Sequence, residues 1–333
     1  MKTQERLRPR LSNFSVQRQS GDKKQRVFCP VFASGGSLSI VFPASAMIPR
    51  LVASLLLLLS ASADVSSGDF DERLAREKML PLSAAAYSGN PGKCLSRKLP
   101  GASIVRQVDV KCDFLFDTCS GFIALSPEDQ AIIISFRGTN NPAQLFAEAG
   151  QTLFEKHINF VAGGTLSNYF YKGYYDAWNA GLKDTFTMLA KVYPKYKLWV
   201  TGHSLGGAMA AIAAAEISAT NLFPKEQILL MTFGQPRTGD KAFALQLDQL
   251  VPQTFRVTHH RDIVPHVPFE FLNFWHHSDE VFYPNGMGEH AKYKRCGKLE
   301  DNSCSDGFLD VSIPDHIFYY EKLIPVYGMM GCI

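Results

Sequence analysis

The segment Gly202-His203-Ser204-Leu205-Gly206 limits what this chain can fold into more than any other. Residues 196–200 before it alternate and then become apolar, as a short strand does, and residues 208–219 after it form an alanine-rich run that favours a helix. A strand, a tight turn with G-x-S-x-G and a helix make a nucleophile elbow, which forces the serine into a strained conformation and exposes its hydroxyl. The alternative is a turn that merely caps the helix, because short motifs recur by chance.

Strand and helix patterns alternate along the rest of the chain. We expect strands at 120–125, 131–136, 196–200, 227–233, 254–258 and 280–283, and helices at 69–87 (broken or kinked at Pro81), 172–193, 208–219, 241–249 and 315–323. Residues 88–103 read as a loop. The alternation predicts an α/β fold of the α/β-hydrolase type, with a mostly parallel central sheet and helices on both faces. In such sheets ligands bind beyond the carboxyl ends of the strands.

The N-terminal part reads as a leader. Residues 47–63 combine a methionine, Arg50, an apolar run and small residues that end at Ala63, which predicts a secretory signal peptide. The apolar run is about half of the roughly 20 residues that a bilayer-spanning helix needs, so no stable membrane span is expected. Residues 1–46 are either an upstream extension before a start at Met47 or a disordered arm. Residues 64–333 are the expected hydrolase domain of a secreted protein.

Charge supports this division. Residues 1–63 carry nine of the 34 Lys and Arg residues and two of the 31 Asp and Glu residues, which leaves 25 basic and 29 acidic residues in 64–333. The predicted mature chain is therefore slightly acidic, and no nucleic-acid partner is expected.

Six cysteines follow the predicted cleavage site: Cys94, Cys112, Cys119, Cys296, Cys304 and Cys332. An even number in a secreted chain suggests disulfides, although six cysteines allow 15 connectivities. Each of the pairs that are close in sequence, 112/119 and 296/304, could close a short loop, and Cys94 and Cys332 would then join the two ends. Buried free thiols are the alternative. Neither C-x-x-C nor H-E-x-x-H occurs, so no zinc site is expected.

A serine hydroxyl needs a base that a carboxylate orients, and in α/β-hydrolases the chain order is serine, acid, histidine. Asp262 follows a predicted strand and is our candidate acid, with an Asx-turn cap as the alternative. His316, at the start of the last predicted helix, is the candidate base. The Leu205 amide and Thr139, which also follows a predicted strand, are the candidate oxyanion-hole donors.

The other histidines are expected to have no catalytic role. His266 lies too near Asp262 in the sequence to reach both partners, and His203 is expected to point away from the serine and pack. His276 and His277 are expected to be core or rim residues. His259 and His260 set no ligand geometry, so no metal and no cofactor are expected.

Several ordered motifs make the sequence resemble the class 3 lipase family, the fungal-type triacylglycerol lipases and related feruloyl esterases, over roughly residues 82–325. The motifs are S-F-R-G-T at 135–139, G-Y-Y-D-A-W at 173–178, the elbow, T-F-G-Q-P-R at 232–237, R-D-I-V-P at 261–265 and Asp315-His316. The resemblance implies Ser204, Asp262 and His316 as the triad and Thr139 with Leu205 as the oxyanion hole. It also favours the disulfides Cys94–Cys332, Cys112–Cys119 and Cys296–Cys304.

The resemblance further implies a lid near residues 140–155. This segment lacks the tryptophan that many lipases carry there, so its apolar residues either face lipid or pack on the body: Leu145, Phe146, Leu153 and Phe154. The sequence as a whole predicts a secreted carboxylic ester hydrolase, a triacylglycerol lipase that acts on lipid or other acyl esters. The alternatives are a phospholipase A1, a feruloyl or other soluble-ester esterase, and a non-catalytic lipid-binding pseudoenzyme. The sequence sets no oligomeric state.

Overall fold

The structure is a computed structural model that describes residues 68–112, 118–139, 157–307 and 310–333. All of them belong to Ala63–Ile333, the second of the two units into which the chain divides. The predicted leader, 1–46 and 47–63, lies outside the described residues. So do the expected lid residues: Leu145, Phe146, Leu153 and Phe154.

An eight-stranded sheet in the order β1-β2-β3-β6-β7-β8-β9-β10 forms the centre of this unit. Its strands are β1 (Ser103–Lys111), β2 (Thr118–Ser126), β3 (Ala131–Phe136), β6 (Lys197–His203), β7 (Ile228–Phe233), β8 (Gln253–His259), β9 (Glu280–Tyr283) and β10 (Lys294–Cys296). The strands from β3 to β9 run parallel, whereas β1, β2 and β10 pair antiparallel at the edges. Two short strands, β4 (Ile158–Asn159) and β5 (Thr165–Leu166), form a separate pair.

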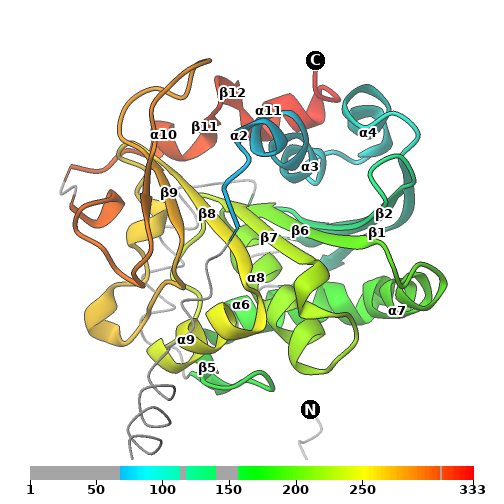
Figure 1. Cartoon of the computed structure of the whole chain (residues 1–333), viewed down its shortest axis with the longest axis horizontal. Coiled ribbons are helices and arrows are strands. Elements are labelled where there is room, and N and C mark those ends of the chain that lie inside the picture. Colours follow the sequence, from blue (N-terminus) through cyan, green and yellow to red (C-terminus); the bar gives the residue numbers. More distant parts are fainter. Residues whose placement is uncertain (1–67, 113–117, 140–156, 308–309) are drawn as a thin grey trace, which may run out of the picture. The chain divides into compact units, whose positions relative to one another are not determined.

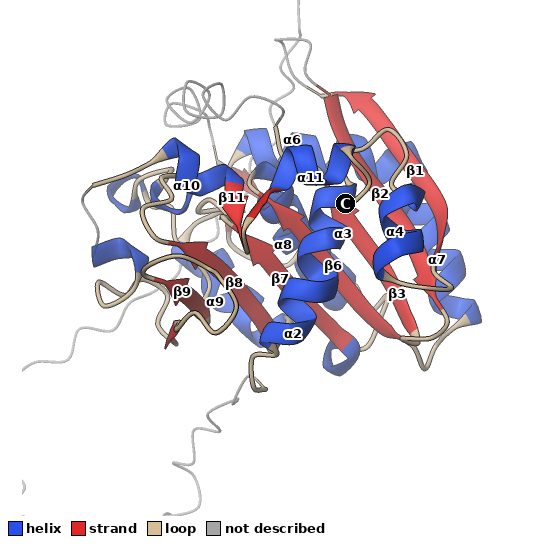
Figure 2. Ribbon diagram, turned by 90° about the horizontal axis from the view of Figure 1, so that it is seen from above, coloured by secondary structure: helices blue, strands red, loops and turns tan. Residues whose placement is uncertain are grey.

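Helices cover both faces of the sheet (Figures 1 and 2). One face packs against α2 (Glu72–Leu74), the π-helix η1 (Ala75–Met79), α3 (Leu80–Ala85), α4 (Gly92–Lys98) and α11 (Ile324–Met329). The other packs against α6 (Asn168–Ala177), the π-helix η2 (Trp178–Leu182), α7 (Lys183–Val192), α8 (Leu205–Ala219) and α9 (Lys241–Leu250). Short elements interrupt the loops: η3 (Lys225–Gln227), η4 (Val264–His266), η5 (Glu270–Leu272), η6 (Ser305–Gly307) and α10 (Ile313–Ile317). Among the described helices, none is long and apolar enough to cross a membrane.

The central strands follow from their composition. Every residue of β3 and of β7 is buried, as expected for strands that have helices on both sides. All of α8 from Leu205 to Ser218 is buried as well, and its alanines let it lie close to β6 and β7. The prediction of an α/β-hydrolase fold with a mostly parallel sheet is confirmed.

The same sheet brings the candidate residues to one edge. Thr139, Ser204 and Asp262 each follow the carboxyl end of a strand, β3, β6 and β8 respectively. Because these strands run in the same direction, their carboxyl ends meet at one edge of the sheet. The fold therefore places three residues from distant parts of the sequence on a common side.

The expected loop at 88–103 is wrong, because the helix α4 occupies Gly92–Lys98 within it. The edge strand β1 at 103–111 was not expected either, and a register shift between Ile104 and Arg106 disrupts the alternating pattern that would indicate it. The helix expected at 69–87 is not broken at Pro81. A π-helical turn directly precedes the proline, and the chain keeps helical angles at Met79 and Leu80, so the helix continues into α3.

The predicted closing helix at 315–323 is wrong as well. The chain leaves α10 after Ile317 and forms a tight hairpin of β11 (Phe318–Tyr319) and β12 (Lys322–Leu323) before α11 begins. Tyr320 and Glu321 in its turn have positive φ angles of 47° and 61°. The turn directs Tyr319 into the core, where its side chain is completely buried.

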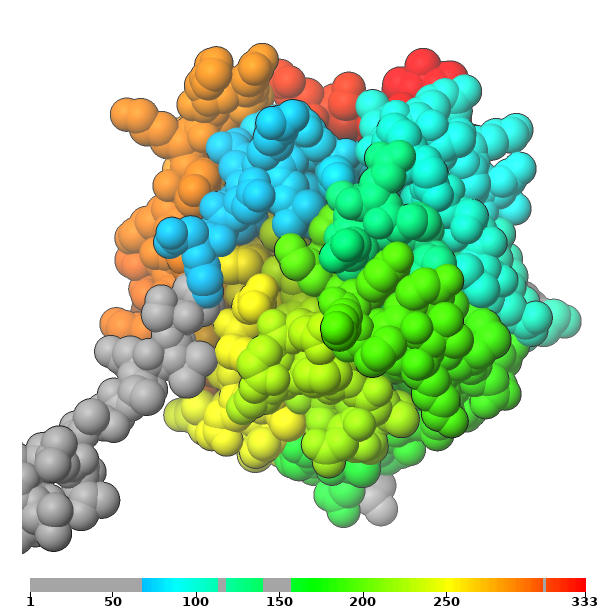
Figure 3. Space-filling view, turned by 45° about the vertical axis from the view of Figure 1, so that its right-hand side comes forward, coloured from blue at the N-terminus to red at the C-terminus, as the bar shows by residue number. Residues whose placement is uncertain are grey.

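Three disulfides lie within the described residues: Cys94–Cys332, Cys112–Cys119 and Cys296–Cys304. They join the same pairs that the resemblance favours. The first connects α4 with the end of the chain, and the space-filling view shows the C-terminal residues, in red, against the cyan segment that contains α4 (Figure 3). An Arg97 hydrogen bond to the Gly331 carbonyl adds to this attachment.

Candidate active site

Ser204 occupies a strained corner between β6 and α8. Its backbone angles are φ 62° and ψ −132°, a region that a residue with a side chain rarely adopts. The corner closes because Gly202 has no side chain, since a Cβ there would lie 2.2 Å from the carbonyl oxygen of Gly206. The Ser204 N–H is bound to the Phe233 carbonyl at 3.0 Å, which fixes the serine at the top of the sheet.

The loop after β3 packs directly against this corner. A Cβ on Gly138 would lie 2.6 Å from the His203 carbonyl oxygen and 3.0 Å from the Ser204 Cβ, so only glycine fits there. Thr139, the next residue, is buried. On the other side of the serine, Leu205 is the first residue of α8, and its N–H has no acceptor within the helix. Both candidate oxyanion-hole residues therefore flank Ser204.

Asp262 and His316 form a buried hydrogen-bonded pair. The His316 Nδ1 lies 2.9 Å and 3.0 Å from the two Asp262 carboxylate oxygens, and both side chains are almost completely buried. Since a carboxylate only accepts, the Nδ1 carries a proton, and in the uncharged form of the ring the Nε2 holds the lone pair. This is the tautomer that a histidine needs to take a proton from a serine hydroxyl.

Two further donors hold the Asp262 carboxylate. The Tyr319 hydroxyl donates to its Oδ2 at 2.5 Å, and the Val264 N–H donates to its Oδ1 at 2.9 Å. Burial by itself raises the pKa of the Asp262 carboxyl, but the charge and hydrogen bond of His316, with the Tyr319 and Val264 bonds, bring that pKa below its ordinary value. The acid therefore stays ionised, as a group that orients a histidine must.

Hydrogen bonds join the loop after β8, which carries Asp262, to the segment around α10, which carries His316. The Ser312 N–H donates to the Arg261 carbonyl at 2.6 Å, and Asp262 and Ser312 form an isolated parallel bridge. One step further, the Asp315 carboxylate contacts the His260 Nδ1 at 3.0 Å and the Arg261 N–H at 3.3 Å. These contacts place His316 beside Asp262 although 54 residues separate them.

His203, which was expected only to pack, contacts the candidate base directly. Its ring stacks on the His316 ring, with centroids 4.5 Å apart and planes 25° apart. Its Nε2 lies 2.8 Å from the His316 carbonyl oxygen and must donate, so its Nδ1 accepts from the Tyr87 hydroxyl at 2.8 Å. Burial, together with the neighbouring His316, lowers the pKa of His203 to about 3, so this ring is uncharged near neutral pH.

The two atoms that would react are buried. Neither the Ser204 Oγ nor the His316 Nε2 has a hydrogen-bond partner within the described part of the chain. A buried polar atom without a partner is costly, so both are available for a substrate or for each other. In uncomplexed enzymes the catalytic hydrogen bonds are often open and tighten only when substrate binds.

Three other histidines make contacts outside this pair. The His276 Nε2 is bound to the Pro265 carbonyl at 2.8 Å, His277 is buried beside Thr254, and His266 has Asp306 at 4.0 Å. In the ranges that the structure describes, no group of three or more His, Cys, Asp or Glu side chains is arranged to hold a metal ion. Sequence reasoning missed Tyr319 and the contact between His203 and His316, for which the sequence gives no local signal.

Comparison with known proteins gives consistent matches. The family model described as Lipase (class 3) matches residues 133–272, from β3 to the loop after Asp262. A lipase of Caenorhabditis elegans is 33% identical over 79% of this chain and 83% of its own length. A secreted mono- and diacylglycerol lipase of Fusarium solani is 27% identical over 85% of this chain and 86% of its own length. The solved structure of the Rhizomucor miehei triacylglyceride lipase has a TM-score of 0.67 and 25% identity, over 80% of this chain and 98% of that one.

Proposed function

This chain belongs to the class 3 lipases, which are carboxylic ester hydrolases of the serine type, and from that premise we propose that it cleaves acylglycerols through an acyl-enzyme on Ser204. The proposal rests on the buried Asp262–His316 pair. The His316 ring stacks on His203, the residue directly before Ser204, whose φ angle is 62°. The relatives add support, because their names describe lipases that act on mono-, di- and triacylglycerols.

The reaction follows from this arrangement. The His316 Nε2 takes the Ser204 proton as the Oγ attacks the ester carbonyl, and Asp262 stabilises the imidazolium that forms. The Leu205 N–H and Thr139 stabilise the oxyanion of the tetrahedral intermediate. His316 then gives its proton to the leaving alcohol, activates a water molecule in the second half of the reaction and returns the proton to Ser204 as the fatty acid leaves.

A substrate panel with matched variants tests the proposal. The wild-type protein is expected to release fatty acid from emulsified tri- and diacylglycerols, and Ser204→Ala is expected to lose at least about 10³-fold in kcat. Ser218→Ala, at the far end of the same helix, removes a buried hydroxyl that binds the Leu250 carbonyl and serves as the control. Full activity in Ser204→Ala would refute the assignment, and a rate that does not rise at the emulsion interface would favour a soluble-ester esterase.

Secretion belongs to the same proposal. The signal-peptide pattern at 47–63, the three disulfides and the secreted Fusarium relative support it. Mass spectrometry of the protein recovered from the medium is expected to find an N-terminus near Asp64. Recovery of a peptide that contains residues 20–26 would contradict cleavage after Ala63.

A further inference from the structure

A cavity of about 660 Å³ is lined by residues that follow Asp262 in the sequence and by residues that precede His316. Six of its lining residues lie between 263 and 271, after the acid, three lie before the base (Asn302, Asp306 and Val311), and Arg237 comes from the loop after β7. Ile263 lies directly after Asp262 and Val311 directly before Ser312, which is bridged to Asp262. The cavity therefore adjoins the segments that carry the candidate acid and base, and its volume fits a small amphiphile.

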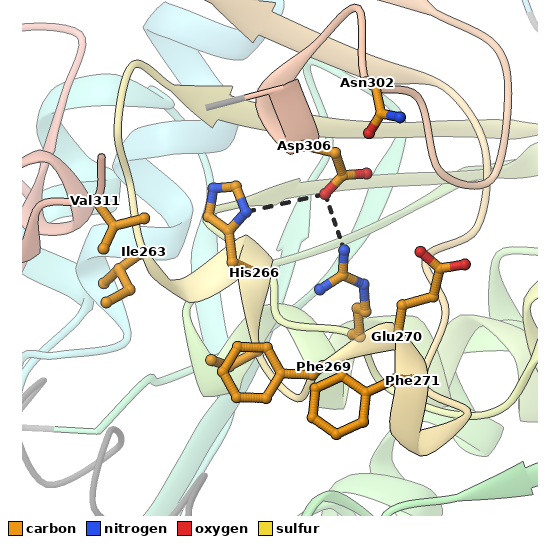
Figure 4. Close-up of a pocket in the computed structure, with 10 residues that line it drawn as sticks. Ile263, His266, Phe269, Glu270, Phe271, Asn302, Asp306 and Val311 are labelled. Atoms are coloured by element: carbon orange, nitrogen blue, oxygen red, sulfur yellow. Dashed lines mark hydrogen bonds and ion pairs between the residues drawn. The ribbon is translucent and has the colours of Figure 1, made fainter. Parts of the chain in front are cut away.

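The lining divides into an apolar and a polar side (Figure 4). The apolar side is formed by Ile263, Val267, Phe269, Phe271 and Val311. The rings of Phe269 and Phe271 stack with centroids 5.3 Å apart, and 81% of Phe271 is exposed. A phenyl ring this exposed at the mouth of a cavity offers contact area to an acyl or alkyl chain. The polar side is formed by Arg237, His266, Glu270, Asn302 and Asp306.

Among the described residues, the polar side presents no unpaired positive charge. Arg237 is the single lysine or arginine among the described lining residues, and its guanidinium is already bound to Glu300 at 2.9 Å and to Asp306 at 2.9 Å. Burial lowers the pKa of His266, so its ring is neutral at pH 7. Glu270 is exposed at the rim and adds a further negative charge.

The polar side of the cavity can form hydrogen bonds with hydroxyl groups but would repel anions. The Asp306 and Glu270 carboxylates can accept from hydroxyl donors, the Asn302 amide can donate or accept, and the His266 Nε2 has no partner within the described residues. A phosphate or a free carboxylate would instead face two carboxylates without a free cation. The excess of acidic residues over 64–333 acts in the same direction.

Building on the proposed function, we propose that this cavity binds the hydroxyl-bearing end of an uncharged amphiphile such as a mono- or diacylglycerol, and selects against esters with anionic headgroups. The hydroxyls lie against Glu270, Asn302 and Asp306, and the adjoining chain lies along Phe269 and Phe271. The subsite thereby directs the triad towards partial glycerides and away from anionic phospholipids.

Binding to a form that cannot turn over separates this inference from the ester chemistry. The full-length Ser204→Ala protein is titrated calorimetrically with 1-O-octylglycerol, an uncharged ether without a scissile ester, and with octyl phosphate, an anion of the same chain length. The ether is expected to bind at least tenfold more tightly than the phosphate. Equal affinities, tighter phosphate binding or no binding of either ligand would overturn the proposal, whereas the proposed function fails separately if the wild type does not hydrolyse esters.

Two exposed positions locate the binding without disturbing the core. In the Ser204→Ala background, Phe271→Ser is expected to weaken ether binding about tenfold, and Glu270→Lys is expected to strengthen phosphate binding about tenfold. Glu128→Lys makes the same charge change in the exposed turn between β2 and β3, at the opposite end of β3 from Thr139, and should change neither affinity. If both lining variants bound the two ligands as their parent does, the ligand would sit elsewhere and the assignment of the cavity would be wrong.

Discussion

The two halves of the candidate site are held in different ways. Ser204 stands between β6 and α8, where consecutive, fully buried residues fix its position through backbone packing. Asp262 stands on the loop after β8 and His316 in the short helix α10, 54 residues later, and hydrogen bonds between these two segments hold them together. The serine half therefore depends on the fold itself, while the acid–base half depends on a few polar contacts. Substitutions that obstruct the backbone packing of the first half should damage folding, and substitutions of the polar contacts in the second half should damage turnover in a folded protein.

Closing the elbow requires that no side chain be present at residue 202, so Gly202→Ala is expected to have the largest effect of all. The new Cβ would lie 2.2 Å and 2.3 Å from the carbonyl oxygen and carbon of Gly206, both backbone atoms that cannot swing away. Overpacking costs typically 1–3 kcal/mol and occasionally more, and we expect a loss of about 3 kcal/mol or more together with loss of hydrolysis. Urea unfolding and ester release measure both.

Gly286→Ala is the matched control for that change, because nothing lies within 4 Å of a Cβ at residue 286. It should unfold at the urea concentration of the wild type and keep full activity. A stable, active Gly202→Ala protein would show that the serine half tolerates rearrangement, and the contrast between the two halves would then be lost.

In the acid–base half, Asp262→Asn should leave the fold intact and abolish most turnover. An amide can present its N–H₂ to the His316 ring and favour the wrong tautomer, which in serine hydrolases lowers kcat by about 10⁴-fold. Asp310→Asn is the control, since Asp310 is an exposed partner of Arg261 on the same pair of loops. The expected signature is a large fall in kcat with an unchanged urea midpoint. A fall in stability equal to that of the elbow variant would contradict the distinction.

The same contrast explains what could be predicted from the sequence. The elbow is local: a strand, G-x-S-x-G and an alanine helix are adjacent in the chain, so their pattern predicts both the fold and the position of Ser204. Asp262 was predictable because it follows a strand whose carboxyl end must lie at the same sheet edge. The candidate site was thus predictable where chain order and strand direction fix the geometry.

Contacts made by side chains across long separations were not predictable. The aromatic run at 318–320 reads as part of a helix, but Tyr320 and Glu321 take positive φ angles without a glycine to signal a turn, and Tyr319 is thereby aimed at Asp262. The stacking of His203 on His316 joins residues 113 positions apart, and no periodicity reports such a contact. The edge strand β1 was hidden for a related reason, because its bulge disrupts the alternation that signals a strand.

Tyr319→Phe tests the hydrogen bond by which Tyr319 supports Asp262 in the acid–base half. It removes the 2.5 Å hydrogen bond to the Asp262 Oδ2 and leaves the ring in place. A hydrogen bond to a charged group contributes about 1.5–3 kcal/mol, so we expect kcat to fall about tenfold or somewhat more at an unchanged KM. Tyr320→Phe, whose hydroxyl contacts Tyr283 instead, is expected to keep the wild-type kcat. Equal kcat values for the two variants would mean that Tyr319 does not position the acid.

His203 connects the two halves, and its removal should have the smallest effect on turnover but a distinct pH dependence. In the folded protein the pKa of His203 is lowered to about 3, mainly by burial, whereas the unfolded chain binds a proton at about 6.5. Its contribution to the free energy of unfolding is therefore complete above pH 6.5 and is lost as the pH falls towards 3, by at most about 1.4 kcal/mol per pH unit.

His203→Phe keeps a ring against His316 but cannot titrate, so the variant should be less stable than the wild type at pH 7, and the difference should shrink between pH 6.5 and 4. Tyr87→Phe loses the hydrogen bond to the His203 Nδ1 but leaves the buried imidazole in place, so its stability should fall with pH in parallel with the wild type. Urea midpoints measured across this range distinguish the two cases. A constant difference between His203→Phe and the wild type would show that His203 does not remain neutral in the folded protein, and that the contact between the two halves is not the one described.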